Sequence, residues 1–216
     1  ILNTETTIQG SGRTDAGVHA LNQHFHFEVK KDIPDLNRFM YSVNCLLPQD
    51  IVIKNFEIVD DNWHSRFNAT KKKYIYKISR RTKDPFLDKL VWLNSDPIDI
   101  GKLKEALSLF VGKHDFKDFT SKETDEDNFV RKIMRISTKN SKDLIEISLV
   151  GDGFMRYEIR FIVGTSVAYA LSLIDLDYIK NHLDSNQNRE IVRYKAPSDG
   201  LYLAQVFYKN IHWVII

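Results

Sequence analysis

The longest apolar segment of this chain runs from Phe154 to Ile174, and charged residues interrupt it near its start. Arg156, Glu158 and Arg160 exclude a membrane span here, because a span needs about 18–20 uninterrupted apolar residues. The segment therefore predicts one long helix in the core of a soluble globular domain.

Regular patterns elsewhere predict groups of strands between helices. Alternating apolar residues predict strands at residues 24–29, 51–59, 72–78, 129–138, 144–150 and 201–208. Apolar residues at helical spacing predict helices at residues 36–47, 100–111 and 176–183. Because the strands come in antiparallel-looking pairs between helices, we expect an α+β fold rather than a doubly wound α/β fold. Prolines and charges cluster near residues 80–98, which favours a boundary there between subdomains 1–80 and 81–216.

The composition is typical of a folded protein in a reducing cytoplasm. Aromatic residues make up 12% of the 216 residues, which excludes disorder for most of the chain. A single cysteine, Cys45, excludes an internal disulfide and a cysteine-based metal cluster. It lies in the predicted core helix 36–47.

Charges are segregated along the chain, although the net charge is only +2. Residues 71–83 contain lysines and arginines without one acid, and Tyr74 and Tyr76 lie within this block. Aromatic side chains among basic residues on a sheet face are typical of proteins that stack bases and hold phosphates. The alternative is a pair of core tyrosines flanked by solvated lysines. Acidic residues cluster instead at 123–127, a segment that we expect to point to solvent.

A glycine-rich loop at residues 10–19 is the densest candidate for chemistry. Its glycines allow a tight loop that brings backbone close to a ligand. Asp15 replaces the third glycine of a dinucleotide-binding loop, and no Gly-Lys-Ser or Gly-Lys-Thr follows, so neither nucleotide-binding loop fits. What remains is a carboxylate beside Arg13, suited to act as a nucleophile or a general base. The alternative, which the spacing alone favours, is an aspartate that caps a turn.

Arg160 is the second candidate. On the expected helix it lies one turn after Arg156 and next to Phe161, so we expect it to be partly buried. A partly buried arginine needs a partner, and Asp15, Glu158 and a backbone carbonyl are all candidates.

Other classes of site are not supported by the sequence. His24 and His26 are two apart, as on one strand face, but two imidazoles without a third ligand make a poor metal site, and we expect no metal. No Gly-x-Ser-x-Gly sequence is present and Cys45 lies in a predicted core helix, so neither serine nor cysteine catalysis is supported.

Five longer motifs follow one another between about residues 8 and 208. The most specific is Gly12-Arg13-Thr14-Asp15-Ala16-Gly17-Val18-His19-Ala20. The second is Arg66-Phe67-Asn68-Ala69-Thr70-Lys71-Lys72-Lys73-Tyr74-Ile75-Tyr76, and the third is Phe110-Val111-Gly112-Lys113-His114-Asp115-Phe116. The fourth is Gly151-Asp152-Gly153-Phe154-Met155-Arg156-Tyr157, which runs into Arg160-Phe161-Ile162-Val163-Gly164, and the fifth is Ala196-Pro197-Ser198-Asp199-Gly200-Leu201-Tyr202-Leu203. In this order the motifs resemble the tRNA pseudouridine synthase A family.

The resemblance implies a fold, a substrate and an assembly. The implied pseudouridine synthase fold is α+β, a mostly antiparallel sheet with flanking helices in two similar RRM/ferredoxin-like subdomains. The implied substrate is tRNA, at uridines 38 to 40 of the anticodon arm. The family works as a homodimer and uses no cofactor.

The resemblance also implies roles for single residues. Asp15 matches the catalytic aspartate, which forms a covalent link to the target nucleotide. Arg160 matches its basic partner, Tyr74 matches the tyrosine that stacks on uracil, and Arg13 matches the arginine that helps to hold the nucleotide out of the helix. The candidates for contacts with RNA phosphates are Lys71, Lys72 and Lys73.

These residue types suit the reaction that the family carries out. Uridine is joined to ribose through N1 and pseudouridine through C5, so the base must be detached, turned and rejoined without being lost. A nearby opposite charge favours the ionised form of a carboxylate, which makes it usable as a nucleophile at uracil C6 or at ribose C1′. The target base must first leave its stack at a cost of a few kcal/mol, which basic contacts to phosphate offset.

The family's chains carry a further strand and a Tyr-Asp-Gly…Gly-Trp-Gln segment ahead of the glycine loop. This sequence starts about eleven residues before that loop, so we expect the N-terminal subdomain to be truncated at its start. The alternative function is therefore a catalytically silent RNA-binding fragment of the same fold. An RRM-type binder is a weaker alternative, because no RNP1-like Gly-Phe-Gly-Phe pattern is present.

Overall fold

The computed structural model describes residues 1–216 except 3, 31, 122–127, 186–187 and 210–216. The acidic segment 123–127, expected to point to solvent, lies outside the described residues. The chain forms two compact units, one of Ile1–Gly12 and His24–Asn68, the other of Arg13–Gln23 and Ala69–Ile216.

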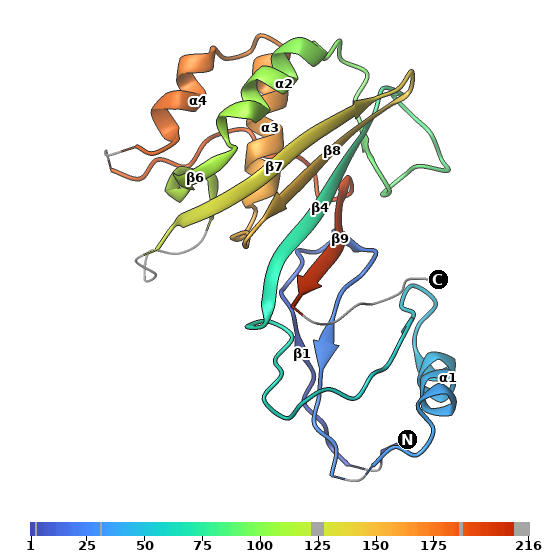
Figure 1. Cartoon of the computed structure of the whole chain (residues 1–216). Coiled ribbons are helices and arrows are strands. Elements are labelled where there is room, and N and C mark those ends of the chain that lie inside the picture. The colour runs from blue at the N-terminus through green and yellow to red at the C-terminus, as the bar shows by residue number, and fades with distance from the viewer. Residues whose placement is uncertain (3, 31, 122–127, 186–187, 210–216) are drawn as a thin grey trace. The chain divides into compact units, whose positions relative to one another are not determined.

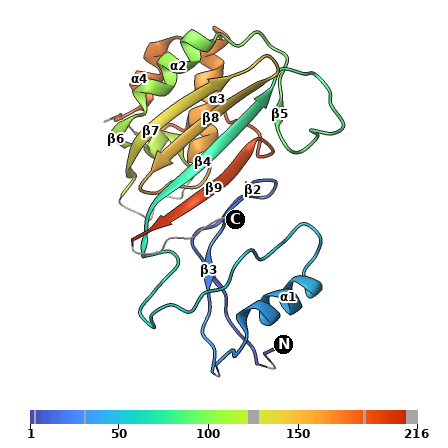
Figure 2. The same cartoon turned by 45° about the vertical axis from the view of Figure 1, so that its right-hand side comes forward.

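The larger unit is built on a mostly antiparallel seven-stranded sheet. Its order is β2-β9-β4-β8-β7-β6, and β5 pairs with β4 beside this path (Figures 1 and 2). The strands are β2 (His19–Ala20), β4 (Ala69–Ser79), β5 (Trp92–Leu93), β6 (Gly112–Asp115), β7 (Val130–Asn140), β8 (Leu144–Gly151) and β9 (Leu201–Tyr208). Only the β2–β9 and β4–β5 pairs are parallel. This sheet confirms the expected mixed fold with a mostly antiparallel sheet.

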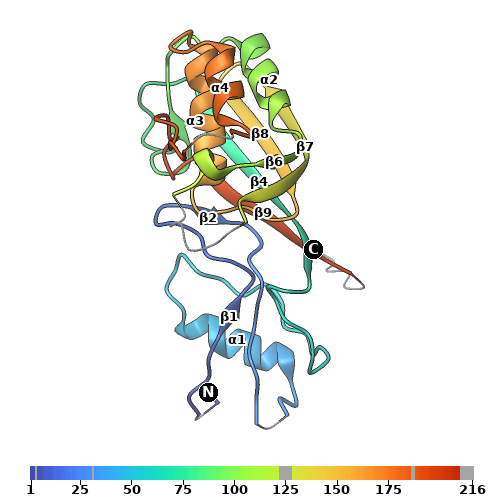
Figure 3. The ribbon, with the colours of Figure 1, turned by 90° about the vertical axis from the view of Figure 1, so that its left-hand side faces the viewer.

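Three helices cover one face of this sheet, as Figure 3 shows. They are α2 (Ile100–Leu109), α3 (Glu158–Ala170) and α4 (Leu176–His182), and a short 3₁₀ turn, η1, spans Lys117–Phe119. Tyr76 and Ile78 of β4 are fully buried in the same core as Leu103 of α2 and Ile162 of α3. Alternation along β4 turns Tyr74, Tyr76 and Ile78 to this face.

Helix α3 is shorter at both ends than the helix predicted for residues 154–174. Tyr157, just before it, has the left-handed φ of 63°, and the backbone of residues 154–157 is not helical. At the other end Ser172 has a φ of 59°, and its N–H donates to Tyr169 O while that of Leu173 donates to Ala168 O. This paired pattern terminates a helix. Arg156 therefore lies outside the helix, and the prediction that it shares a helical face with Arg160 was wrong.

The smaller unit holds a two-stranded antiparallel sheet and one helix. β1 (Gln9–Gly10) pairs with β3 (Phe25–His26), and α1 (Leu36–Leu46) begins after Asp35, whose carboxylate accepts the Arg38 N–H at 2.9 Å. The apolar rings of this unit pack together, with centroid separations of 5.1–6.4 Å. These rings are Phe25, Phe27, Phe39 and Phe56.

Two predictions in the smaller unit were wrong. Residues 51–59 form no strand; the side-chain amide of Asn44 on α1 instead bonds the backbone N–H and carbonyl of Ile53, at 2.7 and 2.9 Å. A side-chain partner thus replaces a strand neighbour for this residue. Cys45 lies on α1 as expected, but it is exposed rather than part of a core.

Across the described residues, no helix has the length and apolar character that crossing a bilayer requires.

Gly164 of α3 allows a close approach that a larger residue would prevent. A Cβ at this position would lie 2.6 Å from both the Ala196 nitrogen and the Tyr194 oxygen. These are backbone atoms, so they cannot move aside as a flexible side chain can. The segment at residues 194–196 therefore packs directly on the backbone of the helix.

We expect Gly164→Ala to lower the free energy of unfolding by about 1–3 kcal/mol, although alanine favours helix by about 1 kcal/mol. Denaturant unfolding measures this difference. Gly153→Ala is the control, because no atom lies within 4 Å of a Cβ there. Equal stability of the two variants would contradict the close-packing argument.

Candidate active site

Asp15 is the first residue of a tight turn in the larger unit. The Val18 N–H donates to the Asp15 carbonyl at 3.0 Å, and Gly17 between them has a φ of +81°. A residue with positive φ at this position is typical of a type II turn and favours glycine. A Cβ on Gly17 would also lie 2.6 Å from Ser198 Oγ, so the turn packs closely on that side chain. Asp15 therefore begins a turn through its backbone carbonyl, as the alternative reading of the sequence expected.

Arg160 provides the partner for this carboxylate. Its Nη1 lies 3.6 Å from Asp15 Oδ2, and its Nε donates to the Ala196 carbonyl at 2.8 Å. The Arg160 side chain is 12% exposed and that of Asp15 is 24% exposed, so water screens the pair only in part. Of the candidate partners for Arg160, the structure therefore shows two, the carboxylate of Asp15 and the backbone carbonyl of Ala196. Glu158 instead accepts the Met155 N–H at 2.7 Å.

The charge of the Asp15 carboxylate acts on Tyr74. Burial, followed by the negative charges of Asp15 and Glu158, raises the pKa of Tyr74 to about 12. The phenol is therefore neutral near pH 7. Its ring meets that of Phe154 edge to face, with centroids 5.3 Å apart, which leaves the orientation of Tyr74 well defined.

Tyr76 belongs to the core rather than to the site. It is fully buried, and its hydroxyl donates to the Pro197 carbonyl at 2.7 Å. Burial is the main cause that raises the pKa of Tyr76 far above its ordinary value. For this tyrosine the core alternative was right.

The segment at residues 196–200 closes one side of the site. Its carbonyls at Ala196 and Pro197 accept bonds from Arg160 and Tyr76, and Ser198 touches the Asp15 turn at Gly17. This segment is part of the fifth sequence motif, but the motif alone does not predict these contacts. Backbone carbonyls have no residue signature, so only the fold reveals them.

Arg13 and the lysines at residues 71–73 were the other residues predicted for the site. Arg13 is exposed, two residues before Asp15. The register of β4 against β8 is unbroken from Lys72 to Ser79, so Lys72 points to the same face as Tyr74 and Lys73 to the opposite face. Lys71 places its Nζ 4.6 Å from the Phe207 ring centroid. The three lysines therefore do not share one face.

Glu158, the first residue of α3, is a buried acid that the sequence analysis considered only as a partner for Arg160. Its side chain is fully buried, and within the described part of the chain its Oε1 has no hydrogen-bond partner. Burial raises the pKa of Glu158 to about 8, against the opposing effects of the Met155 N–H and the charge of Arg131. In the sequence, the signal for this buried acid was a glutamate within an otherwise apolar predicted helix.

Among the residues that the structure describes, no group of three or more His, Cys, Asp or Glu side chains is placed to hold a metal ion. His26 instead bonds the Ser65 hydroxyl through Nδ1 at 3.0 Å.

Comparison with known proteins shows the family to which the chain belongs. Residues 106–209 match the family model described as tRNA pseudouridine synthase. The tRNA pseudouridine synthase A of Bacillus pumilus (strain SAFR-032) is 38% identical over 204 residues, which cover 94% of this chain and 82% of that protein. The chain belongs to the tRNA pseudouridine synthase A family. The enzyme of that name from Bacillus subtilis (strain 168) is 35% identical over the same shares, and tRNA pseudouridine synthase A 1 of Protochlamydia amoebophila (strain UWE25) is 39% identical over 95% of this chain and 81% of its own length.

The raised pKa of Glu158 makes stability depend on pH in a defined direction. Between about pH 4.5 and pH 8 the folded state keeps the proton that the unfolded state has released. Stability therefore falls as the pH rises through this window, by at most about 1.4 kcal/mol per pH unit from this group. We expect Glu158→Gln to remove that part of the decline, measured by denaturant unfolding at pH 5, 6.5 and 8.

The partly exposed Glu146 of β8 provides the control for this charge change. Glu146→Gln should keep the decline of the unmodified chain. If Glu158→Gln also kept it in full, Glu158 would not hold a proton in the folded state.

Proposed function

We propose that this chain isomerises uridine to pseudouridine in tRNA, at positions 38–40 of the anticodon arm, with Asp15 as nucleophile. The observation that carries the proposal is the partly buried ion pair of Asp15 and Arg160, next to the ring of Tyr74. Membership of the tRNA pseudouridine synthase A family supports the class of reaction and the substrate.

Each residue has a defined task in the proposed reaction. Asp15 attacks the target nucleotide, and the guanidinium of Arg160 orients and balances its charge. Tyr74, as a neutral phenol, holds the detached uracil by stacking while the base turns from N1 to C5 attachment. Arg13, exposed on the same loop, helps to hold the nucleotide out of its helix. No cofactor is needed, because the reaction exchanges one bond to ribose for another.

The assembly and the subdomain layout are also proposals. We propose a cytoplasmic homodimer in which residues 1–80 form an N-terminal catalytic subdomain and residues 81–216 a C-terminal one, each related to an RRM/ferredoxin-like unit. The family resemblance supports this layout. Compactness alone divides the chain differently, since β4 pairs with β8 and β9 and so belongs with the larger unit.

Asp15→Ala tests the nucleophile. We expect the unmodified chain to form pseudouridine at positions 38–40 of an unmodified anticodon-arm transcript and the variant to form none, because the variant lacks the carboxylate that is proposed to make the covalent link. Primer-extension stops after carbodiimide treatment report the product. Asp88→Ala, at an exposed position, is the control and should keep activity.

Affinity for the transcript, measured alongside, separates the outcomes. Stops with Asp15→Ala would remove this residue as nucleophile. Salt-sensitive binding by the unmodified chain without any stops would favour a catalytically silent RNA-binding protein instead.

The proposed contacts of the lysines at residues 71–73 with RNA phosphates are tested by a matched pair of variants. Lys72→Ala and Lys73→Ala remove the same charge from opposite faces of β4. Because Lys72 shares the face of Tyr74, we expect Lys72→Ala to weaken tRNA binding more. It should also reduce the slope of log affinity against log salt by about 0.7–0.9 for the lost phosphate contact. Equal effects of the two variants, or no change in slope for either, would contradict this assignment.

A further inference from the structure

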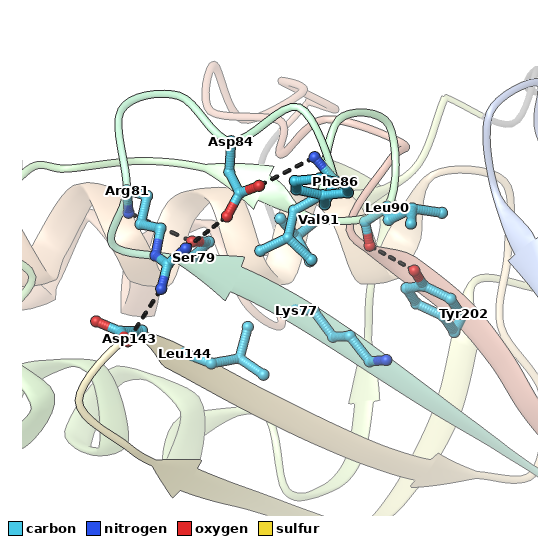
Figure 4. A pocket seen from close by; sticks show the side chains of 11 residues that line it. Lys77, Ser79, Arg81, Asp84, Phe86, Leu90, Val91, Asp143, Leu144 and Tyr202 are labelled. Carbon is cyan, nitrogen blue, oxygen red and sulfur yellow. Dashed lines mark hydrogen bonds and ion pairs between the residues drawn. The ribbon is translucent and has the colours of Figure 1, made fainter.

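The loop at residues 80–91, which joins β4 to β5, spans a cavity instead of packing flat on the sheet. The cavity has a volume of about 510 Å³ and lies between the loop and the sheet face opposite α3 (Figure 4). Lys77, Leu144 and Tyr202 line it from the sheet, and Phe86 and Leu90 line it from the loop. A segment that bridges a hollow gains little from packing, so the contacts at its two ends decide its position.

One end of the loop is held by an arginine between two acids. Arg81 Nη1 lies 2.6 Å from Asp84 Oδ2 within the loop, and Arg81 Nη2 lies 3.4 Å from Asp143 Oδ2 in the turn between β7 and β8. Asp84 is 8% exposed, and its other oxygen accepts the Phe86 N–H at 3.0 Å. This end is therefore fixed to the sheet.

The other end is held by two aromatic side chains from neighbouring strands. His19 Nε2 donates to the Lys89 carbonyl at 2.7 Å, and the Tyr202 hydroxyl donates to the Leu90 carbonyl. A carbonyl only accepts, so Nε2 of His19 carries the hydrogen. His19 and Tyr202 are register partners in the β2–β9 pair, and their rings stack with centroids 4.6 Å apart at 22°.

His19 also ends the turn that carries Asp15. Only residues 16–18 separate the two side chains, and the Val18 N–H bonds the Asp15 carbonyl within this stretch. β2 has only two residues, so few ladder bonds hold the end of the turn. The Leu21 N–H adds a bond to the Leu203 carbonyl at 2.8 Å. The contacts of His19 therefore add to the few backbone bonds that hold this end of the turn.

We propose that His19 and Tyr202 are positioning residues for Asp15: they clamp the loop at residues 80–91 onto the strand end from which the turn carrying Asp15 departs. The proposal rests on the proposed function, since it assigns these residues to the placing of the nucleophile. Neither side chain touches the carboxylate; both act through the backbone of the turn. A shift of the turn moves the Asp15 carboxylate relative to Arg160 and Tyr74, which lowers the rate of the chemical step without removing any contact to tRNA.

Two variants at His19 distinguish the effect of its hydrogen bond to Lys89 from the effect of its ring. His19→Phe keeps a ring that can stack on Tyr202 and removes the N–H, whereas His19→Gln keeps a donor at a similar distance from the backbone and removes the ring. We expect His19→Phe to lower kcat about tenfold with KM within about twofold, and His19→Gln to recover most of that loss. Tyr202→Phe should lower kcat in the same way, and Asp88→Asn in the same loop should leave it unchanged.

Hydrogen exchange of the backbone amides tests the clamp without depending on activity. In His19→Phe and Tyr202→Phe the amides of Val18 and Leu21 should exchange about tenfold faster, while amides in β7 and β8 keep their rates. Unchanged exchange at Val18 and Leu21, or the same kcat for His19→Phe as for the unmodified chain, would overturn the proposal. Equal losses for the Phe and Gln variants at His19 would also overturn it, because the bond to Lys89 would then have no role. An unmodified chain that forms no pseudouridine would refute the proposed function, and the exchange rates would still decide whether the clamp exists.

Discussion

Arg160 joins three segments that lie far apart in the sequence, and the site depends on this junction. Its guanidinium reaches Asp15 in the turn at residues 15–18 and the carbonyl of Ala196, while the Ala196 N–H returns a bond to the Arg160 carbonyl at 2.9 Å. A guanidinium that is only 12% exposed needs such partners, because burying an unpaired charge costs several kcal/mol. Gly164, one turn further along α3, lets the Ala196 backbone come close enough to supply them. A close-packing constraint in the core thus fixes the position of the arginine at the site.

The strand β4 divides its residues between two environments, and both contribute to the site. One face sends Tyr76 and Ile78 into the core and also carries Tyr74, on which the charge of Asp15 acts. The other face carries Lys77, whose Nζ lies 4.4 Å from the centroid of the Tyr202 ring. His19 stacks on the same Tyr202 ring. The face of β4 that points away from the helices is therefore linked, through Tyr202 and His19, to the turn that holds Asp15. The period of two along the strand therefore places Tyr74 and Lys77 on opposite faces of β4.

The sequence predicted those elements whose patterns are strong and local. The strand at residues 201–208 has the bounds that were expected, and α1 and α4 each end one residue earlier than expected. The helix expected at residues 154–174 was too long because apolar character continues beyond both left-handed residues, Tyr157 and Ser172, and neither is a glycine that would signal a break. The strand expected at residues 51–59 failed because β-branched residues do not form a strand without a neighbour, and the Asn44 side chain bonds the backbone there.

The motifs grouped the proposed site residues and offered Asp15 as a partner for Arg160, but other contacts around these residues could not be predicted. Motif order pointed to Asp15, Tyr74 and Arg160 together, and the structure places all of them within one unit. The carbonyl of Ala196 and the bond from His19 to Lys89 had no signal of their own, because any residue type supplies a backbone carbonyl. Burial of Glu158 likewise depends on packing around the start of α3, which its own neighbours in the sequence do not specify.

Two carboxyl groups act on the phenol of Tyr74, and their surroundings separate their roles. Asp15 has a guanidinium at contact distance, whereas Glu158 has an N–H bond and, among the described residues, no cation in contact. With its pKa raised to about 8 by burial, Glu158 is mostly uncharged near pH 7. The site then presents one carboxylate, balanced by Arg160, rather than two. For a substrate as densely negative as RNA this matters, because a second buried carboxylate would add to the repulsion of phosphates near these residues.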